Sequence, residues 1–368
     1  MSEARVARQG AHKSWFQRVE GLPIIAVLAV LVIIFMISAP EVFLHAPIYL
    51  AFLSNVPPLL VLGVALTLVV AAGEIDLSFP SVVAFSGYLL AFSIHELGQT
   101  ELAPVAGWIG LLLSLAGGAL VGYVNGVIVA RIGIPSIIAT LAMQFFWGGI
   151  TTVISGGLSY SLTEADHFAV WHILVGSVDN FPMQAVWAFA VAALLWVVLN
   201  RHRFGEHLLF IGDNAAVAQV VGVDVKREKI RLFVVMGVAA AFASVLLTLD
   251  NREFFNTQGG GYLLEVMAAV FIGGTSVFGG QATMVGSVAG SFIIGLVEAG
   301  LVATGLQGFW VRAVVGIVFI AALVFHMLME QPARRLALLR MILGRAEGRR
   351  GTSSASTLRS SIPKGGQK

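Results

Sequence analysis

The chain has 368 residues, of which 58% are hydrophobic and only 11% are charged, and it contains no cysteine. A soluble domain carries about 25% charged residues, so the composition excludes an ordinary soluble fold. It favours a polytopic membrane protein whose outer surface faces lipid. The lack of cysteine in the sequence excludes a disulfide framework and metal–thiolate chemistry.

The two ends of the chain differ from the apolar middle. Residues 1–20 are polar and basic, and the apolar run 22–39 that follows is close to the length of about 20 residues that spans a bilayer. We therefore predict a retained first membrane helix rather than a cleaved signal peptide. We expect a cytoplasmic basic segment at 1–20, a transmembrane domain at 21–330, and a cytoplasmic, largely disordered tail at 331–368, which is rich in Ser, Gly and Arg.

Apolar runs through the transmembrane domain predict an all-α fold with about ten membrane helices, some of them broken or re-entrant. The runs lie near residues 22–39, 56–72, 80–95, 105–130, 136–155, 183–199, 230–249, 262–273, 284–303 and 309–328. The run at 262–273 is too short to cross about 30 Å of hydrocarbon as a helix. It is expected either to be re-entrant or to continue past the glycines that follow it.

Basic residues gather on one side of this expected topology. Arg131, the cluster between Arg201 and Arg231, and the cluster between Arg334 and Arg350 all fall on loops that a cytoplasmic N-terminus would place inside. Loops on the other side carry mostly acidic residues. By the positive-inside rule, both termini are expected in the cytoplasm.

A polar stretch interrupts the second and third apolar runs at Val69–Ser81, with the letters VVAAGEIDLSFPS. Pro80 suits the first turn of a new helix, and Asp76 and Ser78 suit its N-terminal cap. The alternatives are that Glu74 and Asp76 line an inner gate, or that they bind a cation or proton in an ion-coupled carrier.

A second polar break follows the short apolar run, at Gly273, Gly274, Thr275 and Ser276. Interrupted segments at corresponding positions of two halves are typical of a transport pathway or gate. Three further polar residues fall inside apolar runs: Asn125, Thr140 and Gln144. Such residues either hydrogen-bond between helices or contact a solute.

The one large loop on the basic side, at 200–230, contains a predicted short helix. Asp213 and Asn214 are good N-terminal caps, small apolar residues follow, and Gly222 can end the helix. The helix has too little polar cover for a free surface, and it lacks the bulky apolar and basic faces of an interfacial helix. We therefore expect a partner protein to dock on it.

The loop resembles the cytoplasmic coupling loop of permeases from ABC importers of the ribose or simple-sugar type. The residues that carry this resemblance are Arg203, Phe204, Gly205, Gly212, Asn214, Ala218, Gly222 and Val223. It implies that an ATPase contacts this loop, and the predicted coupling residues are Arg203, Phe204, Gly205, Gly212, Asp213, Asn214, Ala215, Ala216, Ala218 and Gly222. Four other segments are similar to the same family: GEIDLS at 73–78, Asn125-Gly126, IPSIIATL at 134–141, and IGGTS with a Gly-Gly pair at 272–280. Glu74 departs from the commoner family form, which has glycine there.

The resemblance implies a transport subunit of the bacterial cytoplasmic membrane, paired with a second permease as a homodimer or heterodimer and surrounded by membrane lipid. Separate ABC ATP-binding subunits, docked at a coupling helix between spans six and seven, are expected to bind the ATP and Mg. An extracytoplasmic binding protein is expected to deliver a pentose, hexose, polyol or similar solute. The sequence has no phosphate-binding GxxxxGK[ST] loop, so no catalytic residue, metal site, cofactor or nucleic-acid partner is assigned to this chain. An ion-coupled secondary transporter that uses Glu74 and Asp76 is the alternative.

Overall fold

The computed structural model describes residues 21–307 and 310–330. Contacts divide the chain into a unit of Met1–Ile320 and a unit of Ala321–Lys368. Of the second unit, the structure describes residues 321–330, which form the end of the last helix. The predictions for residues 1–20 and 331–368 lie outside the described residues.

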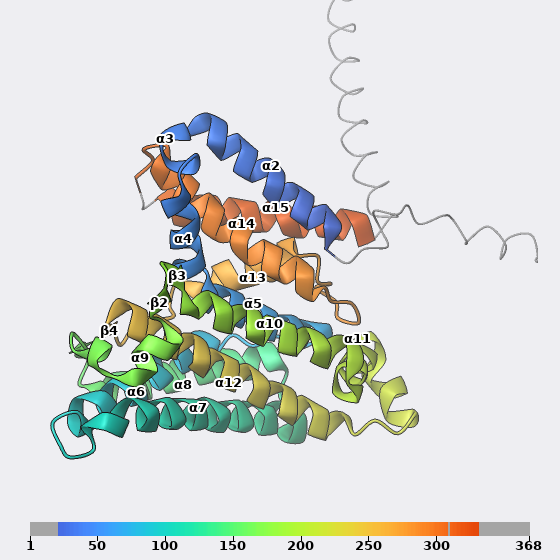
Figure 1. Ribbon diagram of the computed structural model, residues 1–368. Helices are drawn as coiled ribbons and strands as arrows, with labels where there is room; N and C mark the ends of the chain where they lie inside the picture. The colour runs from blue at the N-terminus through green and yellow to red at the C-terminus, as the bar shows by residue number, and fades with distance from the viewer. Residues whose placement is uncertain (1–20, 308–309, 331–368) are drawn as a thin grey trace, which may run out of the picture. The chain divides into compact units, whose positions relative to one another are not determined.

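Helices make up most of the described structure (Figure 1). The α-helices are α2 Leu22–Ser38, α3 Pro40–Phe43, α4 Ala46–Asn55, α5 Pro57–Ala71, α6 Phe79–Leu97, α7 Ala103–Val127, α8 Ser136–Ser155, α9 Ala169–Leu174, α10 Met183–Arg201, α11 Arg203–Val220, α12 Val225–Asn251, α13 Tyr262–Ile272, α14 Met284–Ala303 and α15 Val311–Glu330. The π-helix η2 Ile128–Ile132 extends α7, and η3 Ala165–His167 is a 3-10 turn. The strands are β1 Tyr160–Ser161, β2 Ser177–Val178, β3 Phe181–Pro182 and β4 Glu253–Phe254.

Every apolar run of the sequence coincides with a helix, which confirms an all-α polytopic membrane protein. Among the described residues, five helices are long and apolar enough to cross a membrane, or six if α4 and α5, which are bent by 50°, form one broken span. The total of ten spans remains a prediction. The run at 262–273 does not continue past the glycines, because α13 ends at Ile272.

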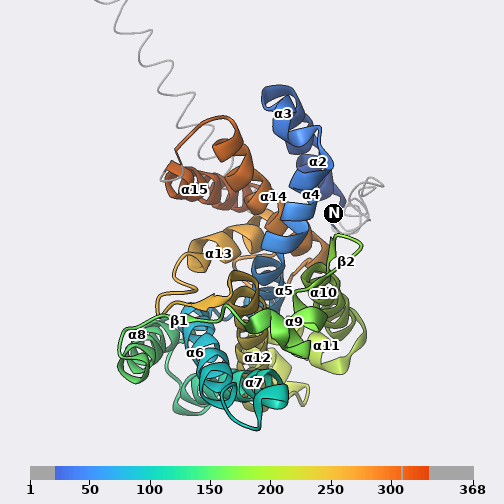
Figure 2. The same cartoon turned by 60° about the vertical axis from the view of Figure 1, so that its left-hand side comes forward.

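Helix α5 forms the centre of the first unit. All 15 of its residues are buried, and α10, α12, α13 and α14 pack against it (Figure 2). A helix that is apolar on every side is expected in a core rather than on a surface. Helix α5 therefore ends in an interior position, and the polar break that follows it begins there.

Helices α7 and α12 form the most extensive helix pair. A Cβ atom added at Gly118 would lie 2.6 Å from the Ala241 side chain, and one added at Gly126 would lie 2.7 Å from the Ile230 Cα. Small residues that let helix backbones approach closely are typical of membrane helix pairs. This pair holds the N-terminal end of α12 in place beside the loop that precedes it.

Short strands and loops lie at the C-terminal end of α12. Strand β1 pairs with β4, and Arg252 forms an ion pair with Asp166 at 3.0 Å. The Trp171 Nε1 donates to the Leu249 carbonyl at 3.0 Å. These contacts join the loop at 156–182 to the end of α12.

Candidate functional site

The two polar breaks predicted from the sequence lie against each other and against α11. The first break, residues 72–78, joins α5 to α6, and the second, residues 273–283, joins α13 to α14. The Gly280 N–H donates to the Ala71 carbonyl at 2.9 Å. A Cβ added at Gly279 would lie 2.8 Å from the Gly73 Cα and 3.0 Å from the Gly212 carbonyl oxygen. Three segments far apart in the sequence therefore meet at backbone distance.

Gly212 is the residue of α11 that makes this approach possible. A Cβ at Gly212 would collide with the Ala71 carbonyl oxygen and press on the Gly280 nitrogen. Backbone atoms cannot move aside as a flexible side chain can. Any larger residue at this position would therefore push α11 away from both breaks.

Side chains from other helices satisfy the backbone of the first break. The Ile75 N–H donates to Ser136 Oγ at 3.1 Å, and the Leu77 N–H donates to Thr140 Oγ1 at 2.9 Å. Both acceptors lie on α8. Because the lipid core offers no hydrogen-bond partners, backbone groups freed at a helix break need partners inside the protein. The segments that resemble the family at 73–78 and 134–141 thus contact each other.

Asp76 holds the start of α6 from inside the same break. Its Oδ1 accepts from the Ser78 N–H at 2.7 Å and from the Ser78 hydroxyl at 2.6 Å, and the Asn125 amide donates to that hydroxyl at 2.6 Å. Asp76 is 2% exposed. Pro80 lies in the first turn of α6, as predicted. Ser78 occupies the N-cap position, but its side chain makes no capping hydrogen bond, contrary to the prediction, because its hydroxyl bonds to Asp76 and Asn125 instead.

Glu74, the carboxylate that departs from the family pattern, forms an ion pair with Lys229 of α12. The two side chains are 10% and 20% exposed, respectively. Nothing in the sequence near Glu74 indicates this partner, because Lys229 belongs to the basic cluster of the large loop. The pair joins the first break to the helix that follows α11.

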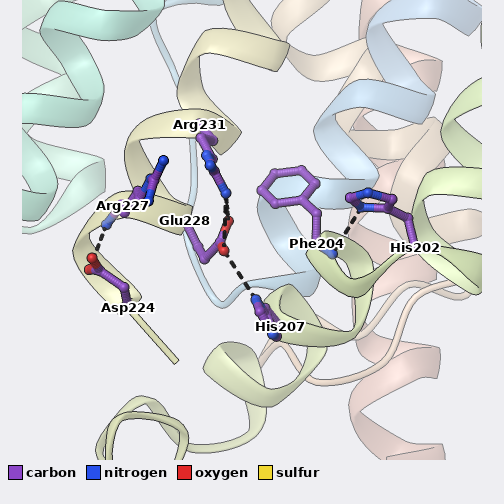
Figure 3. A network of polar contacts seen from close by, with 7 residues as sticks. All are labelled: His202, Phe204, His207, Asp224, Arg227, Glu228 and Arg231. Carbon is purple, nitrogen blue, oxygen red and sulfur yellow. Dashed lines mark hydrogen bonds and ion pairs between the residues drawn. The ribbon is translucent and has the colours of Figure 1, made fainter. Parts of the chain in front are cut away.

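The neighbouring residue, Glu228, joins α12 to α11 instead (Figure 3). Its carboxylate lies 3.0 Å from His207 Nδ1 and 3.3 Å from Arg231 Nη1. Glu228 is 6% exposed, so these partners compensate a carboxylate removed from water. This network was not predicted from the sequence. Its one available signal was an acidic residue within a basic run.

The second break is held mostly by its own residues. Thr283 Oγ1 donates to the Gly273 carbonyl at 2.6 Å, the Ser276 N–H donates to the Gln281 carbonyl at 3.1 Å, and the Phe278 N–H donates to Ser276 Oγ at 3.2 Å. Thr275 and Ser276 are buried, and Gly274 has a φ of 91°. The four predicted residues of this break therefore shape its turn.

Helix α11 is longer than the predicted short helix. It begins at Arg203 and is kinked at Asn214, where φ is −160° and ψ is 103°. Asn214 Oδ1 accepts from the N–H groups of Ala216 and Val217 at 3.0 and 3.1 Å, which confirms the predicted cap. Asp213 precedes the kink and does not cap, because its backbone still belongs to the first half of α11. Gly222, with a φ of 96°, follows the end of the helix.

The ten predicted coupling residues divide between two faces. Phe204, Gly205 and Ala218 are buried and Gly212 packs on the breaks, whereas Arg203, Asp213, Asn214, Ala216 and Gly222 are exposed and Ala215 is half-buried. The exposed face also carries Phe210, Val217, Val220 and Val221, which are 56%, 57%, 87% and 69% exposed. A cavity of about 600 Å³ lies along this face, between Arg203 and Val223. Apolar exposure of this extent is typical of an interaction surface.

Gln144 is the predicted pathway residue that the breaks do not use. It lies on α8, one turn after Thr140, and its buried Oε1 has no hydrogen-bond partner among the described residues. Asn125 and Thr140, in contrast, hold the first break. The Asn125 Oδ1 is also buried and lacks a partner among the described residues.

A cavity of about 860 Å³ lies between α4, α5, α13 and α14. Its polar lining includes Asn55, Asp250, Glu265 and Glu298. Their proximity was not predictable from the sequence, because they come from four separate helices. These four polar side chains make the cavity a candidate site for a polar molecule.

Comparison with known proteins identifies the family. The profile of a family described as branched-chain amino acid transport system / permease component matches residues 48–323. The ribose import permease protein of Escherichia coli strain K12 is 33% identical over 266 residues, which are 71% of this chain and 80% of that protein. The D-allose transport system permease protein of the same strain is 32% identical over 310 residues, 83% of this chain and 91% of that protein. The fructose import permease protein of Rhizobium meliloti is 32% identical over 273 residues, 71% of this chain and 72% of that protein.

These matches cover the helices that form both breaks and α11. The apolar helices and the permease relatives together indicate a multi-pass integral protein of the inner membrane. The chain belongs to the family of permease subunits of sugar ABC importers.

Proposed function

We propose that this permease moves a pentose, hexose, polyol or similar solute inward, by alternating access driven by separate ATP-binding subunits. The relatives that support the proposal are named for ribose, allose and fructose import. The observation that carries the mechanism is the contact of α11 with both helix breaks through Gly212, Ala71 and Gly280. The ion-coupled alternative has less support, because Glu74 is paired with Lys229 and Asp76 is hydrogen-bonded within the break.

In this mechanism, an ATPase binds the exposed face of α11, and its closure on ATP displaces that helix. Backbone contact leaves no flexible side chain between Gly212 and the two breaks, so they move with α11. Helices α6 and α14, which start at the breaks, change their positions as a result. The pathway opens to one side of the membrane and closes to the other.

The docking face is tested by charge substitution at its most exposed apolar residues. We expect Val217→Arg combined with Val220→Arg to abolish co-purification of the ATPase and ATP-dependent uptake in proteoliposomes, while the permease still folds. Val178→Arg, at a valine that is 61% exposed in the β2–β3 hairpin, is the matched control. Retained ATPase binding in the double variant, or uptake driven by an ion gradient without an ATPase, would contradict the proposal.

For solute contact, we propose Gln144, because its buried acceptor is unpartnered among the described residues. Gln144→Leu is expected to raise KM for uptake about tenfold, which corresponds to the loss of about 1.4 kcal/mol of hydrogen bonding. Thr152→Val, on an exposed position of α8, should leave KM unchanged. If Glu298→Gln raises KM and Gln144→Leu does not, the solute contacts the cavity at α14 instead.

The solute itself is identified through the partner. The extracytoplasmic binding protein, purified alone, is screened by thermal shift against sugars, polyols and branched-chain amino acids. A shift with sugars or polyols only is expected. A shift with amino acids only would overturn the substrate class and leave the coupling mechanism in place.

A further inference from the structure

We propose that the groove between α7, α10 and α12 binds one acyl chain of an anionic phospholipid, whose headgroup lies against Arg231 and His202. The groove has a volume of about 930 Å³. Its lining is apolar along three helices that are each apolar enough to cross a membrane. Lipid binding in this groove requires neither the solute nor the ATPase.

The groove follows one face of α12 in a regular pattern. Its α12 lining comprises Ile230, Arg231, Val234, Val235, Val238, Ala239 and Phe242. These positions recur every three or four residues, which places them on one helix face. From Arg231 to Phe242 the helix rises about 17 Å, close to half of the roughly 30 Å hydrocarbon core. The groove thus has the length of one leaflet's acyl chain.

The other walls come from α10 and α7. They include Val191, Leu194 and Leu195 of α10 and Leu115 and Tyr123 of α7. Leu194 and Tyr123 are 61% and 48% exposed. In a membrane protein, apolar side chains exposed along a spanning helix contact lipid, so an acyl chain is the occupant that this lining fits.

Positive charge lies at one end of the groove only. Arg231 has an exposed side chain, and its Nη1 contacts Glu228. A guanidinium has five N–H donors, so its other nitrogen atoms can bind a phosphate. His202 Nδ1 accepts from the Phe204 N–H at 3.1 Å, which leaves the ring proton on Nε2 as a second donor.

The surrounding segment is basic on balance. Residues 200–231 contain six Lys and Arg residues against four Asp and Glu residues. Arg231 and His202 lie on either side of Phe204 in Figure 3, and all three residues line the groove. Basic pockets between membrane helices at the cytoplasmic membrane surface bind anionic lipid headgroups. Charge at one end and apolar walls along the rest match the two parts of an anionic lipid.

The test uses native mass spectrometry of the full-length, delipidated permease with phosphatidylglycerol or phosphatidylcholine. We expect phosphatidylglycerol to bind more tightly, and Arg231→Ala to weaken its binding about fivefold. Arg227→Ala, the same charge change one turn earlier and outside the groove, should have little effect. Equal binding of the two lipids, or equal effects of the two variants, would overturn the proposal.

A second variant leaves the Arg231–Glu228 contact intact. Val238→Trp should fill the groove and lower binding of phosphatidylglycerol, whereas Val197→Trp on the exposed face of α10 should not. The sequence has no cysteine, so Val238→Cys introduces a single thiol. A disulfide between two copies of this variant would show that a second permease, rather than lipid, covers the groove, and would overturn the proposal.

Discussion

The two helix breaks look alike in the sequence but are held in different ways. Side chains from α7, α8 and α12 hold the first break through Asn125, Thr140 and Lys229. The second break depends mainly on its own hydroxyl groups and on close backbone packing. The first break is therefore fixed to the rest of the first unit, whereas the second is fixed chiefly where it meets Ala71 and α11.

The largest effect is expected where both breaks meet α11. Gly212→Ala places a Cβ against the Ala71 carbonyl oxygen. Such overpacking costs about 1–3 kcal/mol or more, so we expect a lower thermal midpoint in detergent and ATP-dependent uptake reduced more than tenfold. Gly149→Ala on α8, where a Cβ meets nothing within 4 Å, is the control. If Gly212→Ala and Gly149→Ala behave alike, the contact of Gly212 with Ala71 and Gly280 plays no part in the mechanism.

The next effect concerns the acceptor inside the first break. Asp76→Ala leaves the Ser78 N–H without its partner, which costs about 1–3 kcal/mol for a buried group. We expect a lower yield of folded permease and a lower thermal midpoint. Asp76→Asn retains an oxygen acceptor and should fold nearly as well. Normal folding of the Ala variant with abolished uptake would assign Asp76 to the gate rather than to the helix cap.

A smaller effect is expected for the ion pair between the first break and α12. Glu74→Gln and Lys229→Met should each lower uptake about tenfold, equivalent to about 1.4 kcal/mol in the barrier to transport. The charge swap, Glu74→Lys with Lys229→Glu, should restore part of the activity. Lys226→Met, at an exposed position of the same helix, is the control. If the swap is no better than the single variants, the pair is not the connection between these segments.

The smallest effects are expected for matched Thr→Val substitutions, one at each break, which compare the two breaks directly. Thr140→Val removes the acceptor of the Leu77 N–H, whereas Thr283→Val removes a donor to the Gly273 carbonyl. A typical hydrogen bond contributes about 0.5–1.5 kcal/mol, and an orphaned N–H is less tolerated than a carbonyl that has lost one bond. Thermal midpoints should therefore fall more for Thr140→Val. A larger fall in thermal midpoint for Thr283→Val would contradict the inferred difference in how the two breaks are held.

Much of the fold could be predicted from the sequence because membrane helices satisfy their own backbone groups. Long apolar runs gave the positions of the helices, and Pro80 gave the start of α6. The cap by Asn214 was also predictable, because it involves neighbours two and three residues away. The first half of α11 was missed, since the apolar Ala and Val residues that indicated a helix all follow Asn214.

The site itself depended on contacts between distant segments. The positions of the two polar breaks and of a helical segment after Asn214 could be predicted from the sequence alone, because local composition shows where a helix cannot continue. The meeting of Gly73, Gly212 and Gly279 and the pairing of Glu74 with Lys229 follow from the packing of distant helices and could not be predicted from the sequence. Such pairings depend on how α5, α12 and α13 pack, and packing depends on the shapes of surfaces that no short segment of sequence contains.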